Sequence, residues 1–276
     1  MTNSLPSVSF SSFGFCHSFV LRHSSFGIRI DSVDVAHLAF LCLAIAVIAF
    51  LYSSVGHAGA SGYIATMTLF GLAMTVIRPT ALVLNILVAT IGSFQFWRAG
   101  HFSWKLFWPF ALLSVPAAYF GGYLQPSAGV LRILIGIVLL FSAARLIFRR
   151  GDPPETVPPS KPTAIGVGAG LGFLSGLTGT GGGIFLTPLI LFCQWAKIRQ
   201  AAAVSAVFIL VNSIGGLVGY FTAVHSVPAL GIYLAIPAIV GGTIGSYLGS
   251  RRLAPRGIAI FLAVVLIIAG TKLIFT

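Results

Sequence analysis

The chain has 276 residues, of which 57% are hydrophobic and only 7% are charged. Soluble domains carry about 25% charged residues, so this composition excludes an ordinary soluble protein and indicates an integral membrane protein. The net charge of +12 does not indicate a nucleic-acid-binding protein, because the 16 lysines and arginines are spread over short loops without a long basic run.

The first 35 residues differ from the rest of the chain. They are rich in serine and phenylalanine and lack a continuous apolar run of about 18 residues. Positive charge does not precede their apolar part, so a cleavable signal peptide is not favoured. We expect 1–35 to be a disordered or interfacial leader, or a stretch upstream of the true start.

Ten apolar segments follow, and each is expected to form a membrane helix or part of one. In chain order they are 36–55, 60–77, 79–97, 104–123, 129–148, 163–178, 183–196, 200–221, 228–249 and 256–275.

Two glycine-rich breaks interrupt this apolar sequence, at 56–62 and at 176–183. Irregular backbone at membrane depth is tolerated only where it is buried in protein or lines a cavity. A matched pair of such breaks in two halves of one chain is typical of a transporter's substrate site.

Glycines and other residues match between the two halves at an offset of 120 residues, which predicts an internal duplication. The repeats are expected at 36–148 and 163–276, joined by the polar, proline-rich linker 149–162. The matching glycines are Gly56/Gly176, Gly59/Gly179, Gly62/Gly182, Gly121/Gly241 and Gly122/Gly242.

The distribution of positive charge sets the expected topology. If the linker is cytoplasmic, eleven lysines and arginines lie inside and five outside. Arg98, Lys105, Lys197 and Arg199 are then inside, and Arg78 lies in an outside loop. The sequence thus predicts an all-α, multi-pass protein of the inner (plasma) membrane. Its two inverted-topology repeats would each have about three full spans plus a glycine-broken helical pair or re-entrant hairpin.

The breaks suit an anion. Exposed backbone N–H groups at the start of a helix, together with the helix dipole, favour negative charge. The expected substrate-binding residues of the breaks are Gly56, His57, Gly59, Ser61, Gly62, Thr178, Gly179, Thr180, Gly181, Gly182 and Gly183. Glycines that only allow close helix packing are the alternative interpretation.

Polar side chains inside the apolar spans extend the predicted site. Amides at membrane depth usually face a bundle interior or a cavity, and Asn85, Ser93, Asn212 and Ser213 are added on this ground. Hydrogen bonding between helices is the alternative for these four. His57 could carry a proton or help to bind an anion, or it could be a structural, hydrogen-bonded residue.

The positions of the acidic residues argue against a cation substrate. Asp31 and Asp34 precede the first span, and Asp152 and Glu155 lie in the linker. No predicted span carries a carboxylate, which cation carriers and proton pumps usually need. An inside-negative potential drives anions outward by about 2.3 kcal/mol per charge per 100 mV, so export needs no coupling ion.

The segment 172–183, followed by Pro188–Leu189, resembles the glycine-rich element of the TauE/SafE sulfite-exporter family, the TSUP transporters. The first half departs from the pattern, with Ala60 and Ser61 in place of glycines and Thr68 in place of proline. The resemblance covers 36–276 and implies a membrane transporter of sulfite, an organosulfonate or a carboxylate.

The leading hypothesis is therefore an exporter of a small anion that works by alternating access at the two breaks. A non-transporting assembly partner and, less favoured, a cation or metal carrier are the alternatives. An enzyme is not expected, because no HExxH motif or carboxylate pair is present. No cofactor and no metal site are predicted. The expected partners are the small anion and the lipid bilayer, without nucleic acid, and a homo-oligomer is compatible with the sequence.

Overall fold

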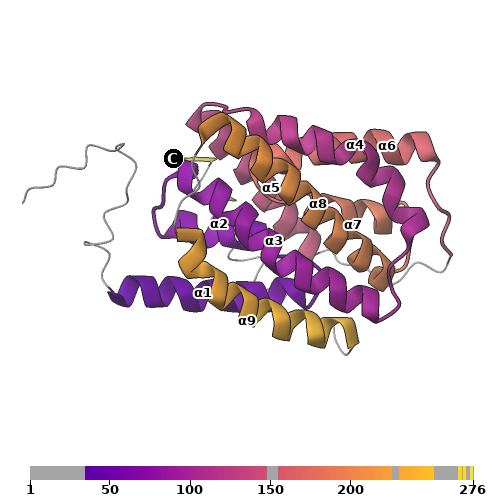
Figure 1. The fold of residues 1–276 in the computed structure, drawn as a ribbon, viewed down its shortest axis with the longest axis horizontal. Helices are drawn as coiled ribbons and strands as arrows, with labels where there is room; N and C mark the ends of the chain where they lie inside the picture. Colours follow the sequence, from indigo (N-terminus) through magenta and orange to yellow (C-terminus); the bar gives the residue numbers. More distant parts are fainter. Residues whose placement is uncertain are drawn as a thin grey trace, which may run out of the picture. The chain divides into compact units, whose positions relative to one another are not determined.

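A computed structural model describes residues 35–147, 155–225 and 230–251, with isolated positions between 267 and 275. Within these ranges every regular element is an α-helix (Figure 1), so the predicted all-α class is confirmed for the described part. The predicted leader, part of the linker and most of the tenth segment lie outside the described residues.

The described helices match the first nine predicted segments in number and order, but α2 and α7 are shorter than predicted and α3 begins five residues earlier. In chain order they are α1 (Val35–Ser53), α2 (Ala60–Leu69), α3 (Met74–Arg98), α4 (Trp104–Tyr123), α5 (Ala128–Ile147), α6 (Lys161–Thr178), α7 (Gly183–Phe192), α8 (Ile198–Val224) and α9 (Leu230–Arg251). Of these, α3, α8 and α9 are long and apolar enough to cross a membrane, and α1, α5 and α7 contain shorter apolar stretches.

The turn between α2 and α3 was predicted wrongly. The sequence suggested a loop at Arg78, but α2 already ends at Leu69 and α3 begins at Met74. Gly71 ends α2, since it has a φ of +76° and its N–H donates to the carbonyl of Thr68 in a Schellman-type closure.

Proline does not stop α3, although Pro79 lies within it. Proline has no N–H to donate to the carbonyl four residues earlier. That carbonyl, on Thr75, instead accepts a hydrogen bond of 3.0 Å from the Tyr220 hydroxyl. A side chain of α8 thus replaces the backbone bond that Pro79 removes from α3.

The helices pack in reciprocal pairs across the two halves of the sequence. Helix α1 lies against α9 and α6 lies against α4, while the long helices α3 and α8 pack against each other between these pairs (Figure 1). One hydrophobic core combines α1, α2, α3 and α5 with α9, and another combines α6, α7 and α8 with α4. Each half therefore contributes its α4 or α9 helix to the core of the other half.

Glycines allow very close contact along the α4–α6 and α1–α9 seams. A Cβ atom placed on any of these glycines would lie 2.0–2.2 Å from a carbonyl oxygen of the facing helix, so only glycine fits. The α4–α6 contacts are Gly168 on Phe110, Gly172 on Ser114 and Gly176 on Ala118, and the α1–α9 contacts are Gly241 on Ala46, Gly245 on Phe50 and Gly249 on Ser54.

The contacts between the described helices give their relative directions. Along each seam the residue numbers of the contacting partners increase in the same direction. Helix α1 therefore runs parallel to α9, and α6 runs parallel to α4. Helices α3 and α8 are antiparallel, because Thr75 bonds to Tyr220 at one end and Phe96 packs with Ala203 at the other.

The loops gather at two ends of the molecule. The linker end contains the α3–α4 turn, the α7–α8 turn and the linker itself, where the Val157 N–H donates to the Gln194 carbonyl at 2.9 Å. The opposite end contains the start of α3 and the end of α4, where Arg78 donates to the Leu124 carbonyl. This grouping matches the one derived from the charges; which end faces the cytoplasm stays a prediction.

Left-handed backbone positions recur in the two halves at an offset of 123 residues: Gly56/Gly179, Gly59/Gly182 and Gly71/Gln194. The offset of 120 derived from the sequence therefore misaligns the breaks by three residues. The glycines of each break recur at every third residue, so they still match one another when the alignment is shifted by three. This repetition concealed the misalignment. Farther along, the offset of 120 describes the packing well, because Gly122 faces α8 and Gly242 faces α3.

Candidate functional site

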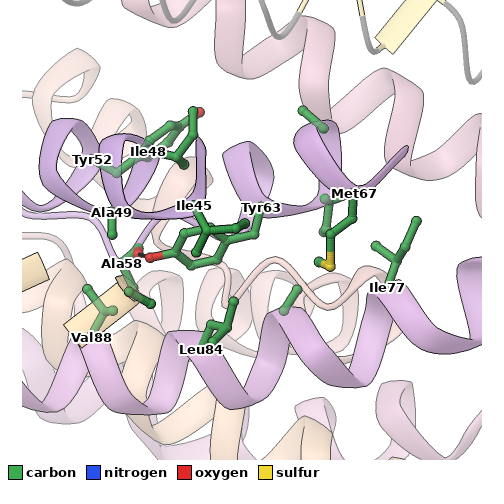
Figure 2. Close-up of a cluster of buried hydrophobic side chains, with 14 of the residues drawn as sticks. Ile45, Ile48, Ala49, Tyr52, Ala58, Tyr63, Met67, Ile77, Leu84 and Val88 are labelled. Carbon is green, nitrogen blue, oxygen red and sulfur yellow. Dashed lines mark hydrogen bonds between the residues drawn. The ribbon is translucent and has the colours of Figure 1, made fainter. Parts of the chain in front are cut away.

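The first break connects α1 to α2 through residues 54–59. Gly56 and Gly59 have φ values of +80° and +105°, which glycine adopts without steric cost. The Tyr63 hydroxyl donates to the Ala58 carbonyl at 2.6 Å and holds the loop against α1 and α3. Figure 2 shows the Tyr63 ring between Ile45 and Leu84, pointing toward Ala58. The break is therefore fixed and buried.

His57 joins this first break to the second half of the chain. Its side chain is buried, with Nδ1 3.1 Å from the Val55 carbonyl and Nε2 3.1 Å from Oγ1 of Thr187 on α7. The Thr187 hydroxyl donates onward to Ser205 of α8 at 2.7 Å. A chain of hydrogen bonds thus runs from the loop of one half into two helices of the other.

The second break connects α6 to α7 through residues 179–182, three of which are left-handed glycines. A Cβ atom placed on Gly181 would lie 2.7 Å from Nδ2 of Asn85 and 3.1 Å from Oγ of Ser213. These two side chains, from the middles of α3 and α8, are 3.4 Å apart and fully buried. The structure therefore brings Asn85, Ser213 and Gly181 together, and their binding of a substrate stays a prediction.

Buried oxygens around the second break lack a protein partner. They are Asn85 Oδ1, Asn212 Oδ1 and Ser175 Oγ. Ser175 lies beside Gly182, with its Cβ 3.1 Å from a Cβ placed there. The Asn212 amide nitrogen instead bonds within its own helix, to the Phe208 carbonyl. Buried polar groups are rarely left unpaired, so each of these oxygens calls for an explanation.

Both breaks end in a helix start without a side-chain cap. Gly59 precedes α2 and Gly182 precedes α7, and neither helix has a side chain bonded to its first N–H groups. Both starts are buried. A buried helix terminus without a cap is unusual and points to another partner for those N–H groups.

Several predicted site residues are engaged elsewhere. The Ser61 hydroxyl donates to Tyr52, and the Thr178 hydroxyl donates to the Leu174 carbonyl and contacts Thr180 at 2.9 Å. The remaining glycines of the predicted set pack against side chains: Gly62 on Ile48 and Tyr52, Gly183 on Ile209. Ser93 is half-buried and lies eight residues, or about 12 Å, along α3 from Asn85, so it is not part of this cluster.

Arg78 is the important residue that the sequence analysis missed. Its guanidinium is fully buried and donates to carbonyls at the ends of two helices. The acceptors are Gly121, Gly122 and Leu124 of the α4 terminus and Gly176 of α6, at 2.7–3.3 Å. These are helix-end carbonyls without intrahelical partners, and the negative ends of two helix dipoles meet there.

Arg78 also lies next to the second break. Its Cγ is 3.1 Å from a Cβ placed on Gly179, and its guanidinium carbon is 5.5 Å from the centre of the Tyr220 ring. Among the described residues the only acid is Glu155, in the linker, so no carboxylate neutralises this arginine there. An arginine beside a proline within an apolar stretch was the available signal in the sequence.

The comparisons with known proteins agree with the membrane fold. The family model described as sulfite exporter TauE/SafE matches residues 41–273. The chain is 41% identical over 240 residues to the probable membrane transporter protein y4hK of Sinorhizobium fredii, covering 85% of this chain and 97% of that one. It is 28% identical over 209 residues to the probable membrane transporter protein MJ0441 of Methanocaldococcus jannaschii, covering 69% and 76%.

A more distant relative, the probable membrane transporter protein YjnA of Bacillus subtilis, is 26% identical over 238 residues, covering 79% of this chain and 92% of that one. No solved structure matches the chain. The family match includes all of the helices described above except the first few residues of α1, and it leaves the leader out. The chain therefore belongs to the sulfite exporter TauE/SafE family of membrane transporters.

Proposed function

We propose that this transporter exports a small anion, such as sulfite, an organosulfonate or a carboxylate, by alternating access at the two breaks. The observation that carries the proposal is the pair of buried, uncapped helix starts at Gly59 and Gly182. Their N–H groups are donors that an anion can use in turn. In a non-transporting partner protein the glycines would only allow close helix packing, and that role would not require uncapped helix starts.

Electrostatics supports a negative substrate. The buried charge next to the second break is the cation of Arg78, and the described parts of the helices contain no carboxylate. The Asn85 amide lies beside Gly181, and its Oδ1 has no hydrogen-bond partner within the protein. A hydroxyl or acidic hydrogen on the substrate, as in hydrogensulfite, would satisfy an unpaired oxygen there.

The arrangement of the helices supports alternating access. The first break lies toward the linker end, where Gly56 packs on Ala202 near the start of α8. The second lies between the middle of the molecule and the opposite end, where Gly179 meets Arg78. Antiparallel equivalent helices are the geometry of inverted-repeat carriers, in which each half can open to one side.

Flux into proteoliposomes tests the proposal directly. The purified chain is expected to move at least one of sulfite, thiosulfate, a sulfonate or a carboxylate, and an imposed potential should speed movement toward the positive side. Gly182→Leu should abolish this flux, whereas Gly170→Leu, at an exposed α6 position with open space, should not. Transport of sodium, potassium or a divalent metal with no anion flux would overturn the proposal.

Cysteine labelling tests the membrane orientation. In a background without the native cysteines, Gln125→Cys should react from outside the cell and Thr156→Cys from the cytoplasm. Both positions are exposed and lie at opposite ends of the molecule. Labelling of both from one side would contradict the proposed inner-membrane topology with a cytoplasmic linker.

A further inference from the structure

A basic pocket of about 330 Å³ opens at the linker end, and none of its lining residues belongs to either break. It is lined by the α3–α4 turn and by the start of α8. The lining residues are Gly100, His101, Phe102, Lys197, Arg199 and Gln200. Nothing in the proposed transport site uses these residues.

Local structure fixes both walls of this basic pocket. Gly100, with a φ of +76°, ends α3 and lets the His101 N–H donate to the Phe96 carbonyl, which places His101 and Phe102 on one wall. On the other wall α8 starts after Lys197 without a side-chain cap. The positive end of a 27-residue helix therefore adds to the charges of Lys197 and Arg199.

These charges are not neutralised within the described parts of the chain. Lys197 and Arg199 are exposed, His101 is half-buried, and the one acid described, Glu155, forms no ion pair with them. The pocket is large enough to admit a compact oxyanion with several oxygens, and lysine and arginine are the side chains that bind such groups best.

The basic pocket adjoins the first break through a small apolar cluster. Phe102, which lines the pocket, packs on Phe96, Ala202 and Ala203. Ala202 in turn is the residue against which Gly56 packs. Ser205, the end of the His57 hydrogen-bond chain, lies five residues or about 7.5 Å along α8 from Gln200.

We infer that this basic pocket is a second anion-binding site, separate from the breaks, for a compact oxyanion that is either free in solution or the headgroup of an anionic lipid. Anion binding here does not depend on transport. Its role as a loading site, from which an anion passes the Phe102 cluster to reach the first break, rests on the proposed function.

Binding of radiolabelled sulfate to the full-length chain in phosphatidylcholine nanodiscs tests the inference. The double variant Lys197→Gln/Arg199→Gln should bind sulfate at least about tenfold more weakly, because two charged partners are lost. The matched control Arg98→Gln/Lys105→Gln removes the same charge at the same end from residues that do not line the pocket, and should bind as the native chain does.

A second arm distinguishes the two sources of the oxyanion. If a lipid headgroup occupies the basic pocket, nanodiscs with phosphatidylglycerol should suppress sulfate binding by the native chain, and the pocket variant should retain less of that lipid. If the ligand is free, sulfate should bind equally in both lipids. Equal sulfate binding and equal lipid retention in the pocket and control variants would overturn the inference.

Flux measured on the same variants separates this inference from the proposed function. A loading site predicts a raised half-saturating anion concentration in the pocket variant with an unchanged maximal rate. Pocket-dependent sulfate binding without flux of any anion would contradict the transport proposal and leave the second site standing. An unchanged half-saturating concentration would overturn the loading role.

Discussion

The two breaks share a backbone but not a chemistry. Each break has left-handed glycines, and two of those in the second break follow those of the first at an offset of 123 residues. Each break leads into a ten-residue helix without a side-chain cap. The first contains a histidine bonded to the Thr187 hydroxyl of the other half, which in turn bonds to Ser205. The second faces the Asn85 amide and lies beside the Arg78 cation. The two breaks therefore present the same kind of uncapped helix start, but one lies beside an imidazole and the other beside an amide and a guanidinium.

This difference assigns separate tasks to the breaks in the proposed transporter. The guanidinium of Arg78 near the second break would favour a negative substrate there. A histidine at the first break is instead a candidate proton carrier, linked to Thr187 of the other half. The following experiments, in order of decreasing expected effect, test whether the two regions are as unlike as their side chains indicate.

Replacing Arg78 should have the largest effect. Arg78→Gln removes a buried donor set and leaves carbonyls at the ends of α4 and α6 without partners. We expect a loss of about 3–5 kcal/mol, seen as a drop of roughly 10 °C in the apparent unfolding midpoint in detergent. Arg98→Gln, at the exposed end of the same helix, is the control and should change the midpoint little. Equal midpoints would show that Arg78 does not join these helices.

Arg78 also shows what the sequence could not reveal. Composition and apolar run length predicted the helices, because both depend only on neighbouring residues. The partners of Arg78 lie 43 to 98 residues away, so no local pattern could distinguish a buried helix-end cap from a loop cation. The adjacent Pro79 strengthened the wrong interpretation, since the Tyr220 hydroxyl that compensates for it is equally remote.

Position along a helix was enough to predict that some of the candidate site residues would meet, although their role in substrate binding stays a prediction. Asn85 and Ser213 lie near the middles of two long helices, and the structure pairs them. Ser93 does not join Asn85 and Ser213, because α3 and α8 are antiparallel and Ser93 lies about 12 Å along α3 from Asn85. Nor could the sequence indicate that the Thr178 and Thr180 hydroxyls bond within the protein in this conformation.

Adding one methyl group to a glycine seam should have the next largest effect. In Gly176→Ala the new Cβ would lie 2.0 Å from the Ala118 carbonyl oxygen, and backbone on both sides prevents relaxation. We expect a loss of about 1–3 kcal/mol. Gly170→Ala, on the open face of α6, should be neutral or slightly stabilising. Thermal unfolding of both variants checks this.

The α1–α9 seam provides a test of the reciprocal packing. In Gly249→Ala the new Cβ would lie at the same 2.0 Å, here from the Ser54 carbonyl oxygen. The loss in the free energy of unfolding should therefore equal that of Gly176→Ala. A tolerated alanine at either position would show that the two seams are not equivalent.

Substitution of His57 at the first break should change the pH dependence of anion flux more than the flux rate at neutral pH. In His57→Gln the amide N–H group can still donate to the Val55 carbonyl or to the Thr187 hydroxyl, but the side chain cannot carry a proton. We expect anion flux within about threefold of the native rate at neutral pH and a flatter profile between about pH 5 and 8. Asn85→Leu should instead lower flux equally across that range. A steep profile retained by His57→Gln would assign His57 a structural role.

The smallest expected effect lies in the turns that follow α2 and α7. Gly71 and Gln194 occupy the same left-handed position with the same backbone hydrogen bonds, and both are exposed. A side chain in this conformation costs about 1–2 kcal/mol, so Gln194→Gly should stabilise the protein by about 1 kcal/mol and Gly71→Ala should destabilise it similarly. No atom lies within 4 Å of a Cβ placed on Gly71, so backbone strain alone sets that change. Shifts of the unfolding midpoint in the same direction would show that the two turns differ in more than their residue type.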